Sequence, residues 1–128
     1  MLNIEEVKEK ITEEENFAND SLEAFEAVYE GKDINDNQNL IELYEGLALD
    51  YNKVKYGIKS LEEDLSILPI LIFEGLPTEK TVKDRDKMVK LEMYDIKQEL
   101  LRVEQVRDKL KMYMDILKFL IQDNGGDS

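Results

Sequence analysis

The carboxylates are the side chains of this sequence most able to do chemistry, and they are concentrated in its first part. Residues 1–50 hold fifteen Asp or Glu against three Lys, a net charge of −12, whereas residues 51–128 hold fifteen acids against fourteen bases, a net of −1. A field of this sign attracts basic surfaces. The candidate partner-binding residues are the acids between residues 13 and 36, namely Glu13, Glu14, Glu15, Asp20, Glu23, Glu26, Glu30, Asp33 and Asp36.

Two interpretations of these acids stay open: they dock on a basic partner, or they only keep the protein in solution. Imitation of nucleic-acid phosphates is one version of the docking interpretation. The first predicted helix has a net charge of −8 over roughly 40 Å, about one charge per 5 Å. A DNA strand carries about one per 3.4 Å. One helix alone therefore falls short of a phosphate strand, although two adjacent acidic helices would approach it.

Several chemistries lack the residues they need. The sequence contains no Cys, His or Trp, which removes thiolate chemistry, disulfides and imidazole proton transfer. Asp33 to Asn39 resembles the start of an EF-hand calcium loop, but Gln38 stands where that loop needs glycine. A turn followed by a helix cap explains the same residues. We therefore expect a non-enzymatic protein with no catalytic residue, cofactor, metal ion or direct nucleic-acid binding.

Apolar spacing predicts three helices that must position these acids. The first runs from about Ile4 to Glu30, the second from Leu40 to Leu68, and the third from Val82 to about Ile121. Glu14 and Ser21 interrupt the apolar stripe of the first helix. Pro69 is expected to end the second helix, leaving residues 70–77 as an apolar connector.

Capping residues mark the expected helix ends. Gly31 is well placed to end the first helix. Asn39 and Glu42 have the spacing of a capping box for the second, and Thr78 or Thr81 can cap the third. The apolar segment 67–73 is expected to close the end of the bundle, with an exposed docking patch as the alternative.

Heptad spacing in the second and third helices is typical of coiled-coil packing. The seam belongs either to one bundle or to an oligomer, and its members are Leu47, Val54, Leu61, Val89, Ile96, Val103, Leu110 and Leu117. The third helix is the longest, so we expect it to overhang the others or to pair with a second copy, with a bend near residues 83–90 as the alternative. The basic cluster Lys83, Arg85, Lys87 and Lys90 is expected to pair with neighbouring acids on the helix surface.

The segment from Leu76 to Glu92, LPTEKTVKDRDKMVKLE, leads into a long heptad helix. It resembles the C-terminal half of small acidic helical proteins of bacteriophages and prophages. That resemblance implies an accessory or host-takeover role through protein contacts. Some such proteins, including inhibitors of restriction and CRISPR systems, are acidic and occupy nucleic-acid-binding sites.

The sequence thus predicts an all-α, antiparallel helical bundle of coiled-coil character, with two shorter helices and one long C-terminal helix. We expect a single domain over residues 1–128, with an acidic half (1–50), a coiled-coil half (51–122) and a flexible tail (123–128). The N-terminus lacks the pattern of a signal peptide, so we expect a soluble, cytoplasmic protein, in the host cytoplasm if phage-encoded. The expected function is docking of the acidic half on a basic, nucleic-acid-binding surface of a partner protein. The alternative is a structural coiled-coil protein that oligomerises, for example as a homodimer. In that case the acidic residues serve only solubility.

Overall fold

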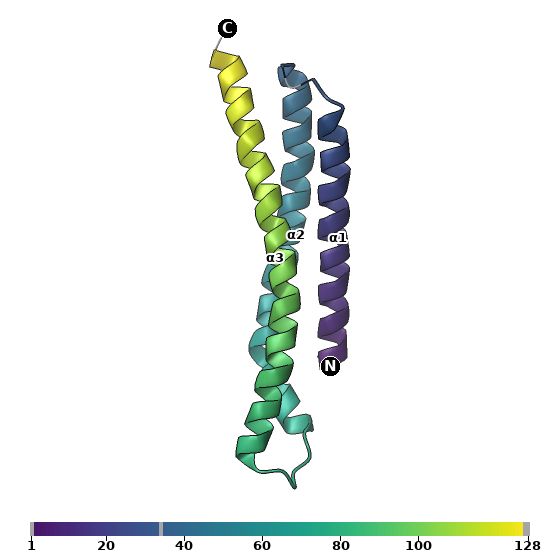
Figure 1. The fold of residues 1–128 in the computed structure, drawn as a ribbon, viewed down its shortest axis with the longest axis vertical. Coiled ribbons are helices and arrows are strands. Elements are labelled where there is room, and N and C mark those ends of the chain that lie inside the picture. Colours follow the sequence, from purple (N-terminus) through teal and green to yellow (C-terminus); the bar gives the residue numbers. More distant parts are fainter. Residues whose placement is uncertain (1, 34, 127–128) are drawn as a thin grey trace.

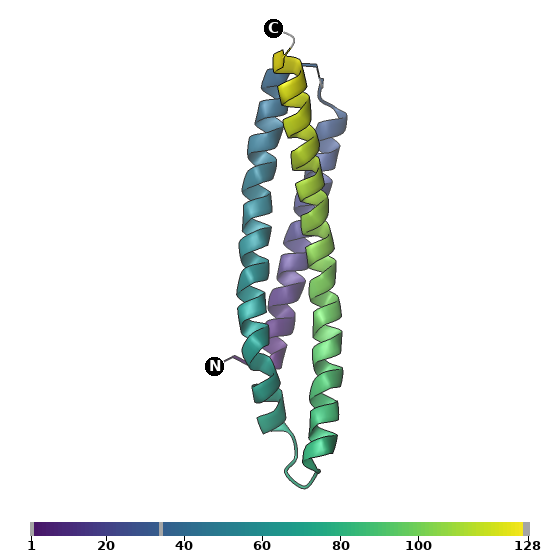
Figure 2. The ribbon, with the colours of Figure 1, turned by 90° about the vertical axis from the view of Figure 1, so that its left-hand side faces the viewer.

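A computed structural model describes residues 2–33 and 35–126, the last two by their backbone alone. Three α-helices form this part of the chain: α1 (Ile4–Glu30), α2 (Asn37–Gly75) and α3 (Val82–Gly126). Consecutive helices run antiparallel and pack against one another in an elongated bundle (Figures 1 and 2). The all-α antiparallel bundle predicted from the sequence is confirmed, and the C-terminal helix is the longest at 45 residues.

Helix α1 has the bounds expected from its apolar stripe and caps. The Asn3 side chain accepts a hydrogen bond from the Glu6 backbone N–H at 2.9 Å, so it satisfies one of the free donors of the first turn. Glu5 and Glu6 lie at the positive end of the helix dipole. Gly31 is the C-terminal cap, and its N–H donates to the Val28 carbonyl.

Helix α2 begins before the capping box predicted at Asn39 and Glu42. Asp36 is the N-cap, and its carboxylate accepts from the Gln38 N–H at 2.9 Å. The prediction that Asn39 caps this helix is therefore wrong. Glu42 instead accepts from the Gln38 side-chain amide within the helix, at 3.3 Å. An aspartate with free backbone N–H groups ahead of it is as good a cap as asparagine, so the chain starts the helix at the first site available.

Pro69 does not end α2, which continues to Gly75, and the connector predicted at residues 70–77 is mostly helix. Proline in a helix interior removes one hydrogen bond and usually bends the axis, and the last turns of α2 bend toward α3 in Figure 2. Packing offsets this cost. Leu68 is fully buried, and the Arg85 guanidinium of α3 lies 4.5 Å from the centre of the Phe73 ring.

Helix α3 begins where one of the two candidate caps stands. The Thr81 hydroxyl oxygen accepts from the Asp84 N–H at 3.1 Å. The helix passes the predicted end at Ile121 and reaches Gly126, so residues 123–126 of the predicted tail are helical, while residues 127 and 128 lie outside the described part. No helix within the described residues has an apolar stretch long enough to cross a bilayer.

The heptad seam lies inside this one bundle. Seven of its eight members are buried, and Val89 is partly buried against them. Residues from all three helices complete the core, including Ile11 of α1 and Ile58 of α2, each at most 1% exposed. The seam is therefore the intramolecular core, and its residues are not available to bind a second copy.

Helix α1 is much shorter than the other two helices of the bundle. With 27, 39 and 45 residues, the helices span roughly 40, 58 and 68 Å. Since α2 continues through Pro69, it accompanies α3 along most of its length. The α2–α3 hairpin extends past the N-terminal end of α1 in both views (Figures 1 and 2). We call this extension, built from the end of α2, the 76–81 turn and the start of α3, the hairpin tip.

Candidate functional site

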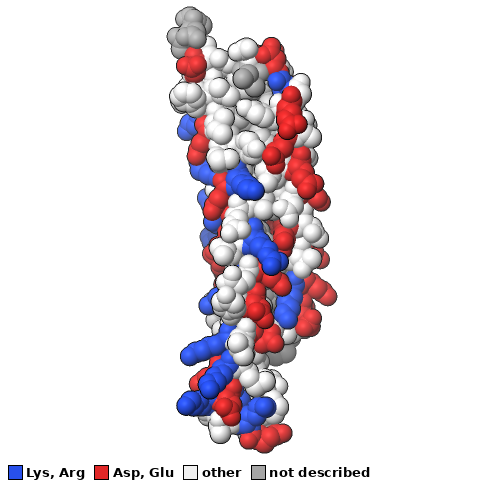
Figure 3. All heavy atoms as spheres, viewed as in Figure 1, with Lys and Arg blue, Asp and Glu red and all other residues white. Residues whose placement is uncertain are grey.

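The outward side of α1 carries a row of acids. Glu9, Glu13, Asp20, Glu23 and Glu30 are all exposed. At about 100° per residue they fall within a sector of about 100°, opposite the buried stripe of the same helix. We call these five residues the α1 acidic face. In Figure 3 acidic side chains follow α1 toward its C-terminal end, whereas basic ones are more frequent along α3 and at the hairpin tip.

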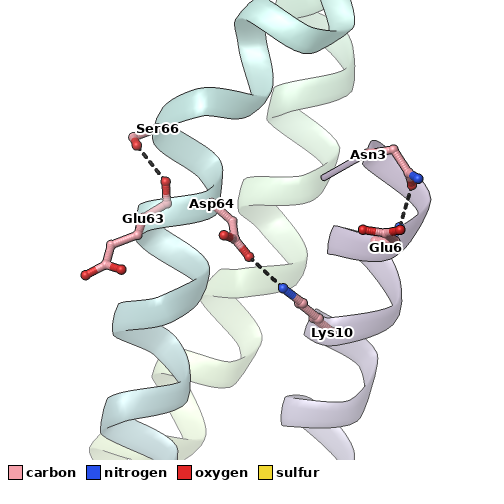
Figure 4. A network of polar contacts seen from close by, with 6 residues as sticks. All are labelled: Asn3, Glu6, Lys10, Glu63, Asp64 and Ser66. Atoms are coloured by element: carbon pink, nitrogen blue, oxygen red, sulfur yellow. Dashed lines mark hydrogen bonds and ion pairs between the residues drawn. The ribbon is translucent and has the colours of Figure 1, made fainter. Parts of the chain in front are cut away.

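Neither lysine of α1 neutralises this face. Lys10 pairs with Asp64 of α2, the Nζ–Oδ2 distance being 3.1 Å (Figure 4). Lys8 lies 3.7 Å from a Glu92 carboxylate oxygen of α3. Among the described residues no carboxylate of α1 forms an ion pair. The two bases of this helix thus contact acids of its neighbours, and no ion pair within the described residues neutralises the α1 acidic face.

Four predicted members of the acidic surface lie on the α1 acidic face, and two continue it. Glu13, Asp20, Glu23 and Glu30 belong to the face itself. Asp33 and Asp36 are exposed in the turn that follows. Their carboxylates accept hydrogen bonds from the backbone N–H groups of residues 35 and 38, each at 2.9 Å, so the turn is fixed by its own acids.

The other three predicted members lie at the flanks of α1. Glu15 is half-buried. Glu26 accepts a hydrogen bond from the Tyr113 hydroxyl of α3 at 3.0 Å. Burial and this bond to a carboxylate raise the pKa of the Tyr113 phenol. Glu14 is turned toward α2, where its carboxylate lies against Gly57, and a methyl group on that glycine would overlap it. Glu14 and Glu26 therefore serve contacts within the bundle.

Sequence reasoning missed Glu9, which helical spacing from Glu13 would have placed on the same face. It also missed an apolar groove of about 650 Å³ at the hairpin tip, where the N-terminal end of α1 stops short of the hairpin. Ile67 and Ile70 are more than half exposed nearby, so segment 67–73 closes the bundle on one side only. The groove depends on α2 continuing past Pro69, which no local signal indicated.

The basic cluster at the start of α3 is organised differently from the expected surface pairing. Arg85 packs over Phe73, and Glu92 pairs with Lys8 of α1. The expected pairs within the cluster are absent among the described residues. Arg85 and Glu92 therefore contact the other helices, whereas the three lysines of the cluster form no ion pair among the described residues.

Over residues 2–33 and 35–124, no three Asp or Glu side chains lie close enough to hold an ion together. The EF-hand-like segment is split, since its second half is the first turn of α2. What the arrangement offers is an acidic helix face without ion pairs on a three-helix bundle.

Comparison of the chain with models of protein families, with curated proteins and with solved structures found no match.

The Glu14 carboxylate is expected to destabilise the fold at neutral pH. Burial raises its pKa, and the neighbouring Glu13 charge raises it further. A folded-state pKa above the unfolded value means that stability falls as pH rises between the two values. Glu14→Gln should therefore raise the free energy of unfolding by about 0.5 kcal/mol at pH 7, a small gain because the carboxylate is still partly hydrated, and give no gain near pH 3. Urea titrations at both pH values would measure this.

Glu23→Gln is the control for this effect, because it removes an exposed carboxylate from the same helix. It should leave the unfolding midpoint nearly unchanged. Equal stabilisation by both substitutions at pH 7 would assign the gain to the general repulsion among the acids and would contradict a specific cost at Glu14.

Proposed function

We propose that this protein is a non-enzymatic binding module whose α1 acidic face docks on a basic surface of a partner protein. The supporting observation is that the face is uncompensated, since Lys8 and Lys10 pair with acids of other helices. Because the acids lie on a continuous α-helix, their backbone needs no further ordering on binding, which lowers the entropic cost of association. Its field also steers a basic partner toward it.

The partner surface we propose is one that otherwise binds nucleic acid. The acids of the 31–36 turn and the exposed Glu42 and Glu45 of α2 continue the charge beyond α1. This brings a second acidic helix beside the first, which moves the charge density toward that of a phosphate strand. In the bacteriophage setting suggested by the resemblance of segment 76–92, such a module would act as an accessory protein or inhibitor.

A set of four neutral substitutions on the α1 acidic face tests the proposal. Glu13→Gln, Asp20→Asn, Glu23→Gln and Glu30→Gln keep size and helicity and remove four charges. The tagged variant should lose proteins that the wild type retains from a cell lysate at about 0.05 M salt, where exposed charges are weakly screened. Those proteins should also be released by excess duplex DNA, because the proposed partner surface binds nucleic acid.

The matched control removes four exposed charges from α2 and the turn that follows it, with Glu62→Gln, Glu63→Gln, Glu74→Gln and Glu79→Gln. Its net charge equals that of the test variant, so general electrostatics are constant. Retention should survive in the control. If test and control retain the same proteins, the α1 acidic face is not the binding site. Retention that DNA does not displace would contradict the nucleic-acid-binding type of partner.

The structural alternative loses its original support, because the seam that was to build an oligomer is the core of the bundle.

A further inference from the structure

Helix α3 has a second apolar stripe that lies outside the core of the bundle. Its members are 39–68% exposed. At about 100° per residue they fall within about 80° of one another around the helix, and a hollow of about 490 Å³ runs beside its C-terminal part. We call this the α3 outer face; its apolar members are Leu91, Tyr94, Leu101, Met112, Ile116 and Phe119.

The register of this face reads the same in both directions about the exposed Gln105. Positions 87, 91, 94 and 98 have gaps of four, three and four residues, and so do positions 112, 116, 119 and 123. A symmetric antiparallel pairing centred on Gln105 brings the first four positions opposite the second four, whereas Leu101 comes opposite Lys109. The resulting contacts are Lys87 with Asp123, Leu91 with Phe119, Tyr94 with Ile116, and Gln98 with Met112.

One pair of opposite charges follows the same symmetry. Lys87 lies at the N-terminal end of the face and Asp123 at its C-terminal end. A parallel pair would place Lys87 beside Lys87 and Asp123 beside Asp123, whereas the antiparallel pair places Lys87 opposite Asp123 and also opposes the helix dipoles. Lys87 and Asp123 form no ion pair among the described residues, so both are available for such a contact.

We propose that the α3 outer face binds a second copy of this chain, in antiparallel orientation with Gln105 at the two-fold axis. In that arrangement Leu91 and Tyr94 of one protomer cover the hollow beside Met112, Ile116 and Phe119 of the other. The contact extends over about 42 Å of helix. Two single helices in contact bury less than a standard interface, so the dimer has a dissociation constant in the range of about 10 µM. The α1 acidic face takes no part in it.

Sedimentation at increasing concentration tests the dimer. The full-length chain should pass from 15.0 kDa to twice that mass as its concentration rises through about 10 µM. Tyr94→Glu combined with Ile116→Glu should abolish the change with helicity retained, since both residues are exposed. A wild-type chain that stays monomeric at about 200 µM overturns the proposal and leaves the face to a different partner.

Disulfide trapping tests the orientation, because the chain has no cysteine of its own. Gln105→Cys should cross-link with itself on oxidation, since the two copies meet at the axis. Leu91→Cys alone should not, because its two copies would lie about 42 Å apart and a disulfide needs Cα atoms within about 7 Å. Mixing Leu91→Cys with Phe119→Cys should yield the mixed cross-link. Self-cross-linking of Leu91→Cys would show a parallel pair and overturn the proposal.

Charge reversal tests the register. Lys87→Asp or Asp123→Lys alone should raise the dissociation constant of the dimer about tenfold, because the symmetry repeats each change at two contacts. The double variant, which restores opposite charges, should return to within about threefold of the wild type. If the double variant is no tighter than the single ones, the two residues do not face each other and the register is wrong.

Discussion

Val103→Asp is expected to unfold the bundle, whereas Leu101→Asp, two residues away on the same helix, is expected to leave it folded. Val103 is fully buried in the core, and Leu101 is 43% exposed. A carboxylate without partners in an apolar core costs about 4 kcal/mol or more, a large part of the about 5–15 kcal/mol that stabilises a typical domain. Thermal unfolding followed by circular dichroism would give the two midpoints.

The comparison should be made at about 1 µM, well below the concentration at which the proposed dimer forms. Leu101 belongs to the α3 outer face, so at higher concentration its substitution would also change self-association. Matching thermal midpoints for the two variants would show that the Val103 side chain is not enclosed by the three helices, and would contradict the packing of the core.

Phe25→Ala is the second substitution with a large expected effect. The Phe25 ring stacks on Tyr29 of α1 at 5.6 Å between centroids and meets Tyr113 of α3 at 5.0 Å. It is 7% exposed. Removing a buried phenyl ring leaves a cavity and costs about 3–4 kcal/mol. Because this cluster joins the C-terminal half of α1 to α3, the loss should fall on the attachment of α1. Urea unfolding would measure it.

Phe17→Ala on the same helix is the matched control, since its ring is 37% exposed. It should cost less than about 1 kcal/mol. A cost at Phe17 equal to that at Phe25 would mean that the α1 stripe is rotated relative to the described packing. The urea dependence should stay the same for both variants if each still unfolds in one step.

Local signals were enough to place α1. Its caps and apolar stripe lie within the helix or next to it, so the bounds Ile4–Glu30 follow from neighbouring residues alone. The end of α2 could not be predicted in this way. A proline at position 69 normally stops a helix, and it is tolerated here because Leu68 and Phe73 pack into the fold on either side of it. Those contacts are with α3 and the core, and they depend on tertiary register.

The candidate site, too, could be predicted from the sequence only in part. Helical spacing predicts which acids face outward, and the exposed positions of Glu13, Asp20 and Glu23 agree with it. Spacing cannot predict that Glu26 meets Tyr113, 87 residues away, or that Glu14 lies against Gly57. The interruptions that Glu14 and Ser21 made in the α1 stripe were visible in the sequence. Their explanation required the neighbouring helix, because an acid and a serine take the place of larger apolar side chains there.

The two turns between the helices have a consequence for the speed of folding. Residues 31–36 and 76–81 each join antiparallel neighbours by six residues, so most contacts form between helices adjacent in sequence. Chains dominated by such contacts lose little entropy when loops close, and they fold within about microseconds to milliseconds. A newly synthesised chain would thus complete its bundle, with the outward side of α1 already fixed, long before a typical encounter with a binding partner.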